Sequence, residues 1–358
     1  MKEKYISIMV LAVLLVLIFA NMYSKKIINQ EETLTSTETS KYTLPISQRS
    51  FYLGLTPTPK HWPNSSFSDI VAAYEETGKI AEVAMVWVEK QGIGEFEILK
   101  KNRIIEGIRV YGLKPVITLN FAKIEIDASS ISYVIDAPEG IVADLSDQEF
   151  RKRWIEEAKD IAQEFKPEYF SLGNEINDYF YIHPEELNPY LSLFDEAKKE
   201  IKTVSPKTKV FVVFSYNNLI ENEQWHLIQE FDSRVDVIGL TSYPWKQYEV
   251  PEDISADYYS KIKQYTTKPI VFTEIGWISS PPATEKQQSE FLLKFLERTR
   301  DLKVEIVSWL FLHEIEITGF IGKISSPEVG TIALKKSDGT DKEIYSLWLN
   351  LKKLPKIT

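Results

Sequence analysis

Eight short β-type runs alternate with amphipathic helical stretches over residues 46–358, and this alternation is the strongest constraint on the fold. The runs lie near residues 51–55, 82–88, 115–120, 168–172, 209–214, 235–240, 269–273 and 305–310. Strands that alternate with helices are typical of repeated βα units with a parallel sheet. A body of about 310 residues also has the size of one α/β barrel with insertions. The sequence therefore predicts a single-domain α/β protein with a (β/α)8 TIM-barrel fold.

Prolines mark the points where helices end and strands begin. Lys-Pro pairs precede three of the runs, at Pro115, Pro167 and Pro269, and a proline both stops a helix and favours extended backbone before it. A doubly wound open sheet is the alternative architecture, but it usually carries a glycine-rich phosphate-binding turn after its first strand. Here Gly54 leads into Thr-Pro-Thr-Pro at 56–59, which does not form such a turn.

Composition excludes several classes of function. The formal charge is −10 and the pI is near 5.2, and no run rich in Lys and Arg follows residue 26, so we do not expect a nucleic-acid partner. The absence of cysteine excludes thiolate chemistry, and the four histidines are too widely spaced in the sequence for a His-based metal site. We expect a protein that needs neither a metal nor another cofactor.

The N-terminal segment differs from the rest of the chain. Residues 1–23 contain an apolar run preceded by Lys2 and Lys4, which predicts a signal peptide or a single membrane anchor. Residues 24–45 are rich in Ser, Thr, Glu and Lys and are typical of a flexible linker. We therefore expect a catalytic domain at 46–358 that is extracellular, either secreted or anchored to the cell membrane, with the N-terminal segment as its one membrane contact.

Two of the predicted strands end in a glutamate. The fourth strand runs into Asn174-Glu175, and the seventh ends at Glu274. TIM barrels carry their chemistry at the C-terminal ends of the strands, so these carboxylates should face each other across the mouth. A facing pair suits cleavage of a glycosidic bond, with Glu175 as acid/base and Glu274 as nucleophile. The alternative of a metal-binding pair lacks the His or Asp companions that hard cations usually recruit.

Aromatic residues gather near the predicted strand ends. Flat aromatic faces stack on the C–H faces of sugars, which makes these residues candidates for substrate binding together with Asn174. The candidates are Trp87, Tyr243, Trp245, Trp277 and Trp309, with Trp62 nearby. Tyr243 is also placed to donate a hydrogen bond to Glu274. Three other tryptophans, Trp154, Trp225 and Trp348, are expected to serve packing. The insertion at 121–146 should form part of the cleft wall, and His313 should face sugar or solvent.

At these residues the sequence resembles the large clan of retaining TIM-barrel glycoside hydrolases, and most of all the arabinogalactan endo-β-1,4-galactanases. The motif at 173–177, Gly-Asn-Glu-Ile-Asn, is similar to their strand 4, and the segment 236–245 is similar to their strand 6. The resemblance implies a retaining β-glycosidase with Glu175 as acid/base, Glu274 as nucleophile and Trp309 beneath the cleaved sugar. The substrate it implies is a polysaccharide or oligosaccharide, with β-1,4-galactan as one possibility.

Two departures from that family leave alternatives open. The family carries an arginine near the end of strand 2, where this chain has Ala84 and Met85, and strand 3 ends in Asn120-Phe121 rather than His-Tyr. A nucleophile without that cation would be a weaker one. The second hypothesis is therefore a catalytically impaired, membrane-tethered carbohydrate-binding protein on a TIM barrel. A barrel enzyme acting on non-sugar substrates is a third hypothesis, which lacks support from metal ligands or a phosphate loop.

Overall fold

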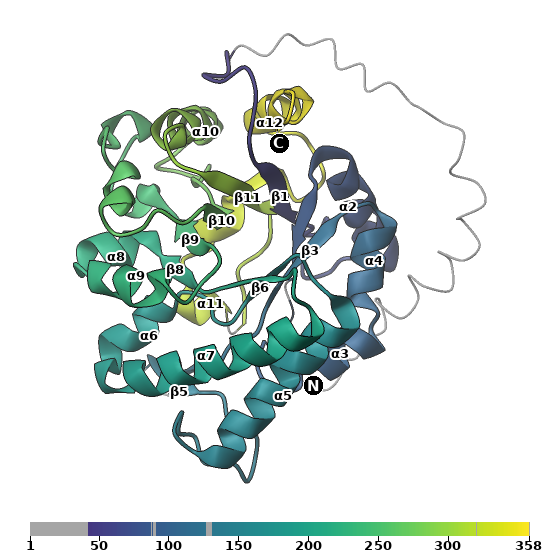
Figure 1. Ribbon diagram of the computed structural model, residues 1–358. Coiled ribbons are helices and arrows are strands. Elements are labelled where there is room, and N and C mark those ends of the chain that lie inside the picture. Colours follow the sequence, from purple (N-terminus) through teal and green to yellow (C-terminus); the bar gives the residue numbers. More distant parts are fainter. Residues whose placement is uncertain (1–41, 87, 89–90, 127–130, 320, 358) are drawn as a thin grey trace.

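The computed structural model describes residues 42–357 except 87, 89–90, 127–130 and 320. Parallel strands form a closed ring with helices outside it (Figure 1). In chain order the strands of this ring are β1 (Tyr52–Thr56), β2 (Val83–Met85), β3 (Lys114–Thr118), β6 (Tyr169–Ser171), β7 (Lys209–Phe211), β8 (Val213–Ser215), β9 (Ile238–Ser242), β10 (Ile270–Ile275) and β11 (Val304–His313).

The ring closes through the strand formed by β7 and β8. Neighbouring strands follow the order β7-β6-β3-β2-β1-β11-β10-β9-β8, and β7 and β8 are halves of one strand interrupted at Val212. The Val212 carbonyl still accepts a hydrogen bond of 3.0 Å from Gly239 of β9. The ring therefore has eight strands, as predicted, and the open-sheet alternative is wrong. The closed parallel ring with outer helices confirms the predicted TIM barrel.

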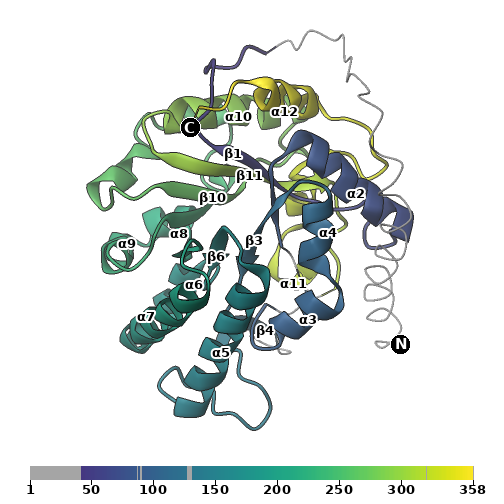
Figure 2. The same ribbon diagram turned by 45° about the vertical axis from the view of Figure 1, so that its right-hand side comes forward.

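Helices surround the ring of strands on its outside, as Figures 1 and 2 show. The α-helices are α2 (Phe67–Ile80), α3 (Glu95–Lys101), α4 (Ile104–Val110), α5 (Gln148–Phe165), α6 (Ile176–Ile182), α7 (Leu187–Val204), α8 (Tyr216–Glu221), α9 (Trp225–Asp232), α10 (Glu285–Thr299), α11 (Ile321–Ile324) and α12 (Glu343–Lys353). Short 3-10 helices are η2 (Pro184–Glu186), η3 (Pro244–Lys246), η4 (Pro251–Asp253), η5 (Ser260–Gln264) and η6 (Pro327–Thr331).

Helix α5 shows how local sequence sets these elements. The Asp147 side chain caps its first turn by accepting from the Phe150 N–H at 2.9 Å. Buried residues recur at helical spacing from Phe150 through Trp154 to Phe165, so one stripe faces the barrel. The helix ends at Phe165, two residues before Pro167, as predicted. The residue between them, Lys166, is left-handed with φ 44° and ψ 55° rather than extended, so that part of the prediction is wrong.

Two further sets of strands lie outside the ring. In the insertion at 121–146, β4 (Ala122–Ile126) pairs antiparallel with β5 (Ile131–Ile135). The sequence analysis expected an insertion here but not a hairpin. A short strand, β12 (Ala333–Lys335), extends the long β11 in parallel beyond the ring. Both additions lie after the C-terminal ends of their ring strands, which is the end where the two glutamates emerge.

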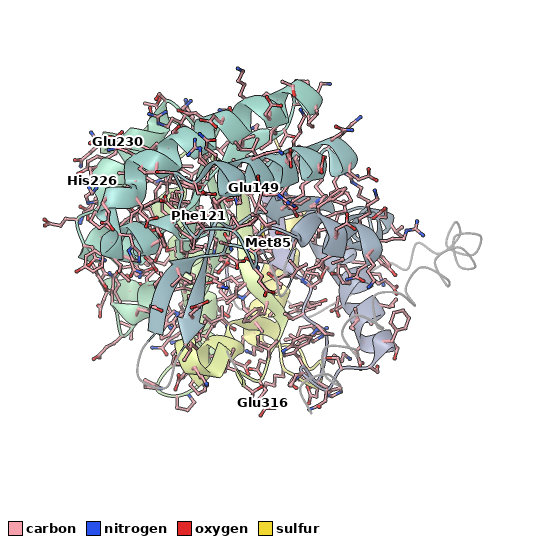
Figure 3. All side chains as sticks on the ribbon, turned by 90° about the horizontal axis from the view of Figure 1, so that it is seen from below. Met85, Phe121, Glu149, His226, Glu230 and Glu316 are labelled. Carbon is pink, nitrogen blue, oxygen red and sulfur yellow. The ribbon has the colours of Figure 1, made fainter. Side chains whose placement is uncertain are left out.

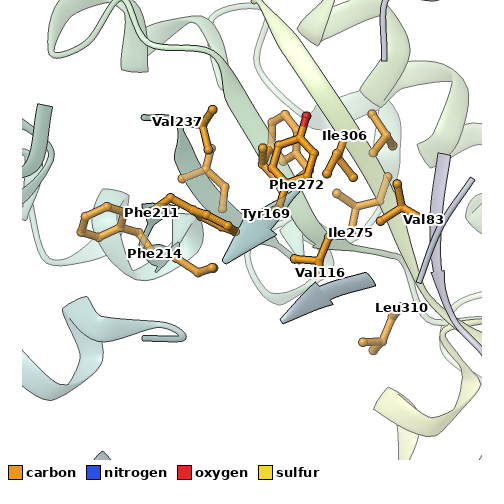
Figure 4. Packing of buried hydrophobic residues seen from close by; sticks show 14 of the residues in the cluster. Val83, Val116, Tyr169, Phe211, Phe214, Val237, Phe272, Ile275, Ile306 and Leu310 are labelled. Atoms are coloured by element: carbon orange, nitrogen blue, oxygen red, sulfur yellow. The ribbon is translucent and has the colours of Figure 1, made fainter. Parts of the chain in front are cut away.

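The N-terminal end of the barrel is closed by packed and paired side chains. Glu305 accepts hydrogen bonds from the Tyr169 hydroxyl at 2.7 Å and from Lys209 Nζ at 2.6 Å. Figure 4 shows apolar neighbours of this layer, among them Val83 and Ile306, within the buried cluster. Because this end is filled and internally paired, the open mouth at the opposite end is where a substrate can enter.

The predicted N-terminal segment and most of the predicted linker, residues 1–41, lie outside the described residues. Within the described part of the chain, none of the helices combines the length and apolar character that crossing a membrane requires.

Candidate functional site

Hydroxyl groups at the C-terminal end of strand β9, and directly after it, hydrogen-bond both glutamates at the mouth of the barrel. Glu274 of β10 lies in register with Thr241 of β9, and the Thr241 hydroxyl donates to Glu175 Oε1 at 2.5 Å. The Tyr243 hydroxyl, two residues further along the chain, donates to Glu274 Oε2 at 2.5 Å. Thr241 lies within β9, and Tyr243 follows directly after this strand, which ends at Ser242. The two carboxylates therefore face the same short stretch of backbone, and the predicted contact between Tyr243 and Glu274 is present.

Glu175 is presented by an unusual backbone conformation. It caps the start of α6 with φ 48° and ψ 42°, in the left-handed region that costs a non-glycine residue roughly 1 kcal/mol. The preceding Asn174 is braced from strand 3, because its N–H donates to Asn120 Oδ1 at 2.8 Å. Among the described residues, none hydrogen-bonds the Asn174 side-chain amide. That amide is therefore free to bind a ligand beside Glu175.

Asn177 attaches the start of α6 to the end of β8. Its side chain accepts from the Ser215 N–H at 2.7 Å and donates to the Ser215 carbonyl at 3.2 Å. It also donates to Gln224 Oε1 at 3.1 Å, and Gln224 Nε2 returns a bond of 2.8 Å to the Asn177 carbonyl. All of these groups are buried. The network fixes the helix that carries Glu175, a role that the sequence analysis did not assign to this residue.

Replacing Asn177 with Ala is expected to lower the free energy of unfolding by about 2 to 4 kcal/mol. The change leaves the Ser215 N–H and Gln224 Oε1 buried without the partners that the Asn177 side chain supplied, and each such group costs about 1 to 3 kcal/mol. Urea unfolding measures the difference. The matched control is Asn188→Ala at an exposed position of α7, which should change stability by less than about 0.5 kcal/mol. Equal stability of the two variants would contradict the role of the network.

Asn217 fixes Tyr243 in the same manner. Its side chain accepts from the Tyr243 N–H at 2.8 Å and donates to the Tyr243 carbonyl at 3.0 Å. It thus joins the residues after strand 5 to those after strand 6. Like Thr241, Asn217 was missed as a site residue, and the only sequence signal was a polar residue at the end of a predicted strand.

The charge on Glu274 is opposed by burial and favoured by two neighbours. Burial, together with the nearby charge of Glu175, raises the pKa of Glu274 to about 7. The hydrogen bond from Tyr243 and the positive charge of Lys246 act in the opposite direction and lower that pKa. Because like charges repel, a charged Glu175 makes it harder for Glu274 to ionise, whereas the Tyr243 hydroxyl and Lys246 make it easier.

Comparisons with known proteins concern the family and the fold of this chain. The model of glycosyl hydrolase family 53 matches residues 149–300, a segment that contains both glutamates. Among solved structures, an exo-β-1,4-mannosidase from Opitutaceae bacterium strain TAV5 superimposes with a TM-score of 0.65 at 15% identity, over 88% of this chain and 61% of its own. GH5_18 from Streptomyces cattleya, in complex with GlcNAc, gives a TM-score of 0.60 at 15% identity, over 86% of this chain and 80% of its own.

This chain has the fold of the TIM-barrel glycoside hydrolases. The family match confirms the predicted resemblance, because family 53 is that of the arabinogalactan endo-β-1,4-galactanases. A β-D-glucuronidase from Dictyoglomus thermophilum is also similar, with a TM-score of 0.53 at 13% identity over 88% of this chain. The chain spans 61% of the length of the mannosidase and 52% of that of the glucuronidase. No curated protein sequence gives a significant match.

The positively charged residue near Glu274 lies at a different position from the strand 2 arginine of the glycoside hydrolases that this chain resembles. The strand 2 position holds Met85, near the middle of the molecule in Figure 3, with the buried Ala84 before it. A positive charge comes instead from Lys246, which ends η3 beyond strand 6. Its Nζ lies 5.7 Å from the centre of the Tyr243 ring. The sequence analysis named the missing arginine but did not identify this lysine.

Two of the predicted sugar-stacking tryptophans lie in the core, and these predictions are wrong. Trp309 is 0% exposed and packs against Phe291 of α10 and Trp348 of α12, because its position on β11 turns it towards the outer helices. Trp277 is 1% exposed and also packs on Phe291, with ring centres 5.5 Å apart. Neither ring offers a face to a substrate.

The other predicted aromatic residues differ in their surroundings. Trp245 is half-buried beside Tyr243 and remains a candidate platform, while Trp87 lies outside the described residues. Trp62 lines an open pocket together with His61 and Glu316.

The packing roles predicted for three tryptophans agree with the structure. Trp154 and Trp348 are fully buried, and Trp225 stacks on Tyr265 at 4.8 Å. The expectation for His313 is wrong. This residue is buried, with Nδ1 at 2.8 Å from the Thr58 carbonyl oxygen, so it faces neither sugar nor solvent.

Proposed function

We propose that this protein is a retaining β-glycosidase that hydrolyses a polysaccharide or oligosaccharide, with Glu175 as acid/base and Glu274 as nucleophile. One observation carries the proposal: Thr241 of β9 and Tyr243, the residue directly after that strand, each hydrogen-bond one of the two glutamates. The two carboxyls thus have different partners, the Thr241 hydroxyl for Glu175 and the Tyr243 hydroxyl for Glu274. Members of such a pair can differ in protonation, as an acid and a nucleophile must.

The reaction then proceeds in two steps. Glu274 attacks the anomeric carbon and forms a covalent bond to it, while the bond to the leaving oxygen breaks and Glu175 gives that oxygen its proton. In the second step Glu175 takes a proton from water, the water oxygen attacks the anomeric carbon, and the bond to Glu274 breaks. The Tyr243 hydroxyl and the charge of Lys246 stabilise the Glu274 carboxylate before attack and when it departs.

The substrate class is tested by a panel of polysaccharides. The match to family 53 supports β-1,4-galactan as the first candidate, and β-mannan, β-glucan and xylan are the comparisons. The first product formed from a β-linked oligosaccharide should be the β-anomer, which proton NMR at early times detects. Initial release of the α-anomer would contradict the retaining mechanism. Hydrolysis of one of the other polysaccharides instead of galactan would contradict β-1,4-galactan as the substrate. The proposed hydrolytic reaction would still stand.

A carbohydrate-binding protein without catalysis is the second candidate, favoured by Met85 in place of the strand 2 cation. It predicts retention on an insoluble polysaccharide without the release of reducing ends. A protein that releases reducing ends at a rate that depends on Glu274 contradicts this candidate.

The proposal extends to where the protein acts. Polysaccharides lie outside the cell, and the apolar residues 5–23 support export or anchoring. Cell fractionation of the full chain should recover the protein in the medium or the membrane fraction, and recovery in the cytosol would contradict this location.

Replacing Tyr243 with Phe is expected to move the acidic limb of the pH–rate profile upward by about one unit. The tyrosine hydrogen bond lowers the pKa of Glu274, so its removal raises that pKa, and a larger share of the nucleophile is protonated at low pH. A hydrogen bond to a charged group contributes about 1.5 to 3 kcal/mol, and 1.36 kcal/mol equals one pKa unit. The profile of kcat/KM against pH measures the shift.

Tyr265→Phe is the control for this prediction. Tyr265 stacks on Trp225 outside the barrel, so its loss should leave the profile in place. An unchanged acidic limb in the Tyr243→Phe variant would contradict the assignment of Tyr243 as the donor that stabilises the nucleophile.

A further inference from the structure

Asp178 lies one helical turn beyond Glu175 and has one oxygen fixed and the other open. Its Oδ1 accepts a hydrogen bond of 2.7 Å from Asn218 Nδ2 of α8. Among the described residues, none hydrogen-bonds Oδ2, and the side chain is half-buried. A carboxylate held at one oxygen in this way has little freedom to turn. Its free oxygen is therefore aimed at a defined place beside the catalytic pair.

Three further groups lie around this carboxylate. Burial, together with the charge of Glu175, raises the pKa of Asp178 to about 7, and the Asn218 hydrogen bond and the charge of Lys246 act in the opposite direction. The Tyr133 hydroxyl, which comes from the hairpin strand β5, is close enough to Asp178 and Glu175 for their charges to add to the effect of burial on its pKa. Donors and acceptors from α6, α8, β5 and η3 therefore converge on one place.

The geometry of the proposed reaction indicates which part of the substrate would meet the region around Asp178. The nucleophile lies under the anomeric carbon, whereas the acid lies at the oxygen that departs. Groups beyond Glu175, away from Glu274, therefore meet the leaving group. Asp178 and Asn218 follow strands 4 and 5, while Glu274 ends strand 7, so they lie on the leaving-group side. Hydroxyl groups of a sugar are the partners that a carboxylate, an amide, a phenol and an ammonium group can all bind.

We propose that Asp178 determines specificity by binding hydroxyl groups of the leaving-group sugar, with Tyr133 and Lys246 lining the same subsite. This inference rests on the proposed function and adds to it. The natural leaving group is then a neutral sugar, and the enzyme depends on contacts to both sides of the bond that it cleaves. Binding energy from such contacts is realised only when the leaving group is itself a sugar.

The test compares two substrates that share a glycone and differ in the leaving group. One is the 4-nitrophenyl β-glycoside of the sugar that the full protein hydrolyses, and the other is the corresponding β-linked trisaccharide. In the Asp178→Asn variant, the ratio of kcat/KM for the trisaccharide to that for the nitrophenyl glycoside should fall about 10-fold to 100-fold, as expected for a lost hydrogen bond to a charged group. Asp160→Asn, an exposed position of α5, should leave the ratio unchanged.

A second measurement distinguishes recognition from a general effect on catalysis. With a disaccharide added as acceptor, the unaltered protein should transfer the glycone to it, and Asp178→Asn should need a higher acceptor concentration for the same yield. Equal losses on both substrates, or no loss on either, would overturn the inference while leaving the proposed function. If the unaltered protein hydrolyses neither substrate, the proposed function fails, and the inference fails with it.

Discussion

Replacing Glu274 with Ala is expected to lower the turnover of a β-glycoside by at least about 10⁴-fold, as the loss of a nucleophile does in other enzymes. The change removes the carboxylate that the Tyr243 hydroxyl hydrogen-bonds, which is the group proposed to form the covalent intermediate. The measurement is kcat with a nitrophenyl glycoside, for which departure of the leaving group needs little acid assistance.

Azide provides the diagnostic readout for this variant. A small anion can occupy the space left by the carboxylate and attack from the same face, so azide should restore turnover and give the α-glycosyl azide. Glu230→Ala, on the outer helix α9 at the periphery in Figure 3, is the matched control and should retain full activity. Undiminished hydrolysis by Glu274→Ala, or a β-azide product, would remove Glu274 from the role of nucleophile.

Replacing Glu175 with Gln is expected to slow hydrolysis of a natural oligosaccharide by about 10² to 10⁴-fold, the usual contribution of general acid–base catalysis. The loss should be much smaller in the first step with an activated leaving group, because such a group departs without a proton. The dependence of kcat/KM on leaving-group pKa therefore becomes steep in the variant. A series of substituted phenyl glycosides measures this slope.

The second step of the same variant supplies an independent check. Water then lacks its general base, whereas azide needs none, so azide should accelerate turnover and give the β-glycosyl azide. Opposite anomers from the Glu175 and Glu274 variants would distinguish the two roles within one experiment. A slope equal to that of the unaltered protein, without any effect of azide, would mean that Glu175 is not the acid/base.

The strands and their two glutamates could be predicted from the sequence because both follow from local chemistry. A parallel strand covered on both sides needs a continuous apolar run, and prolines such as Pro167 and Pro269 mark where the run begins. A carboxylate directly after such a run must emerge at the C-terminal end of the barrel. That rule was sufficient to place Glu175 and Glu274 at the same mouth.

The direction in which each side chain faces was decided by the tertiary structure. Trp309 lies in register with Leu55 of β1 and with Ile275 of β10, which turns its ring towards the helices. The pairing of β10 with both neighbours is shifted at irregular positions, and one such shift moves every later side chain to the other face. Shifts of this kind depend on contacts between strands, so the alternation along a single strand does not reveal them.

Contacts between residues far apart in the chain also could not be predicted from sequence patterns within one segment. The hydrogen bonds of Asp178 with Asn218 and of Tyr243 with Asn217 join segments that follow different strands. Each partner is an ordinary polar residue in its own segment. Strand periodicity and terminal carboxylates were thus determined by the sequence alone, because they depend on neighbours along the chain. The groups that tune and extend the site were decided by the tertiary structure, since only the packing of separate segments brings the side chains that follow strands 4, 5 and 6 into contact.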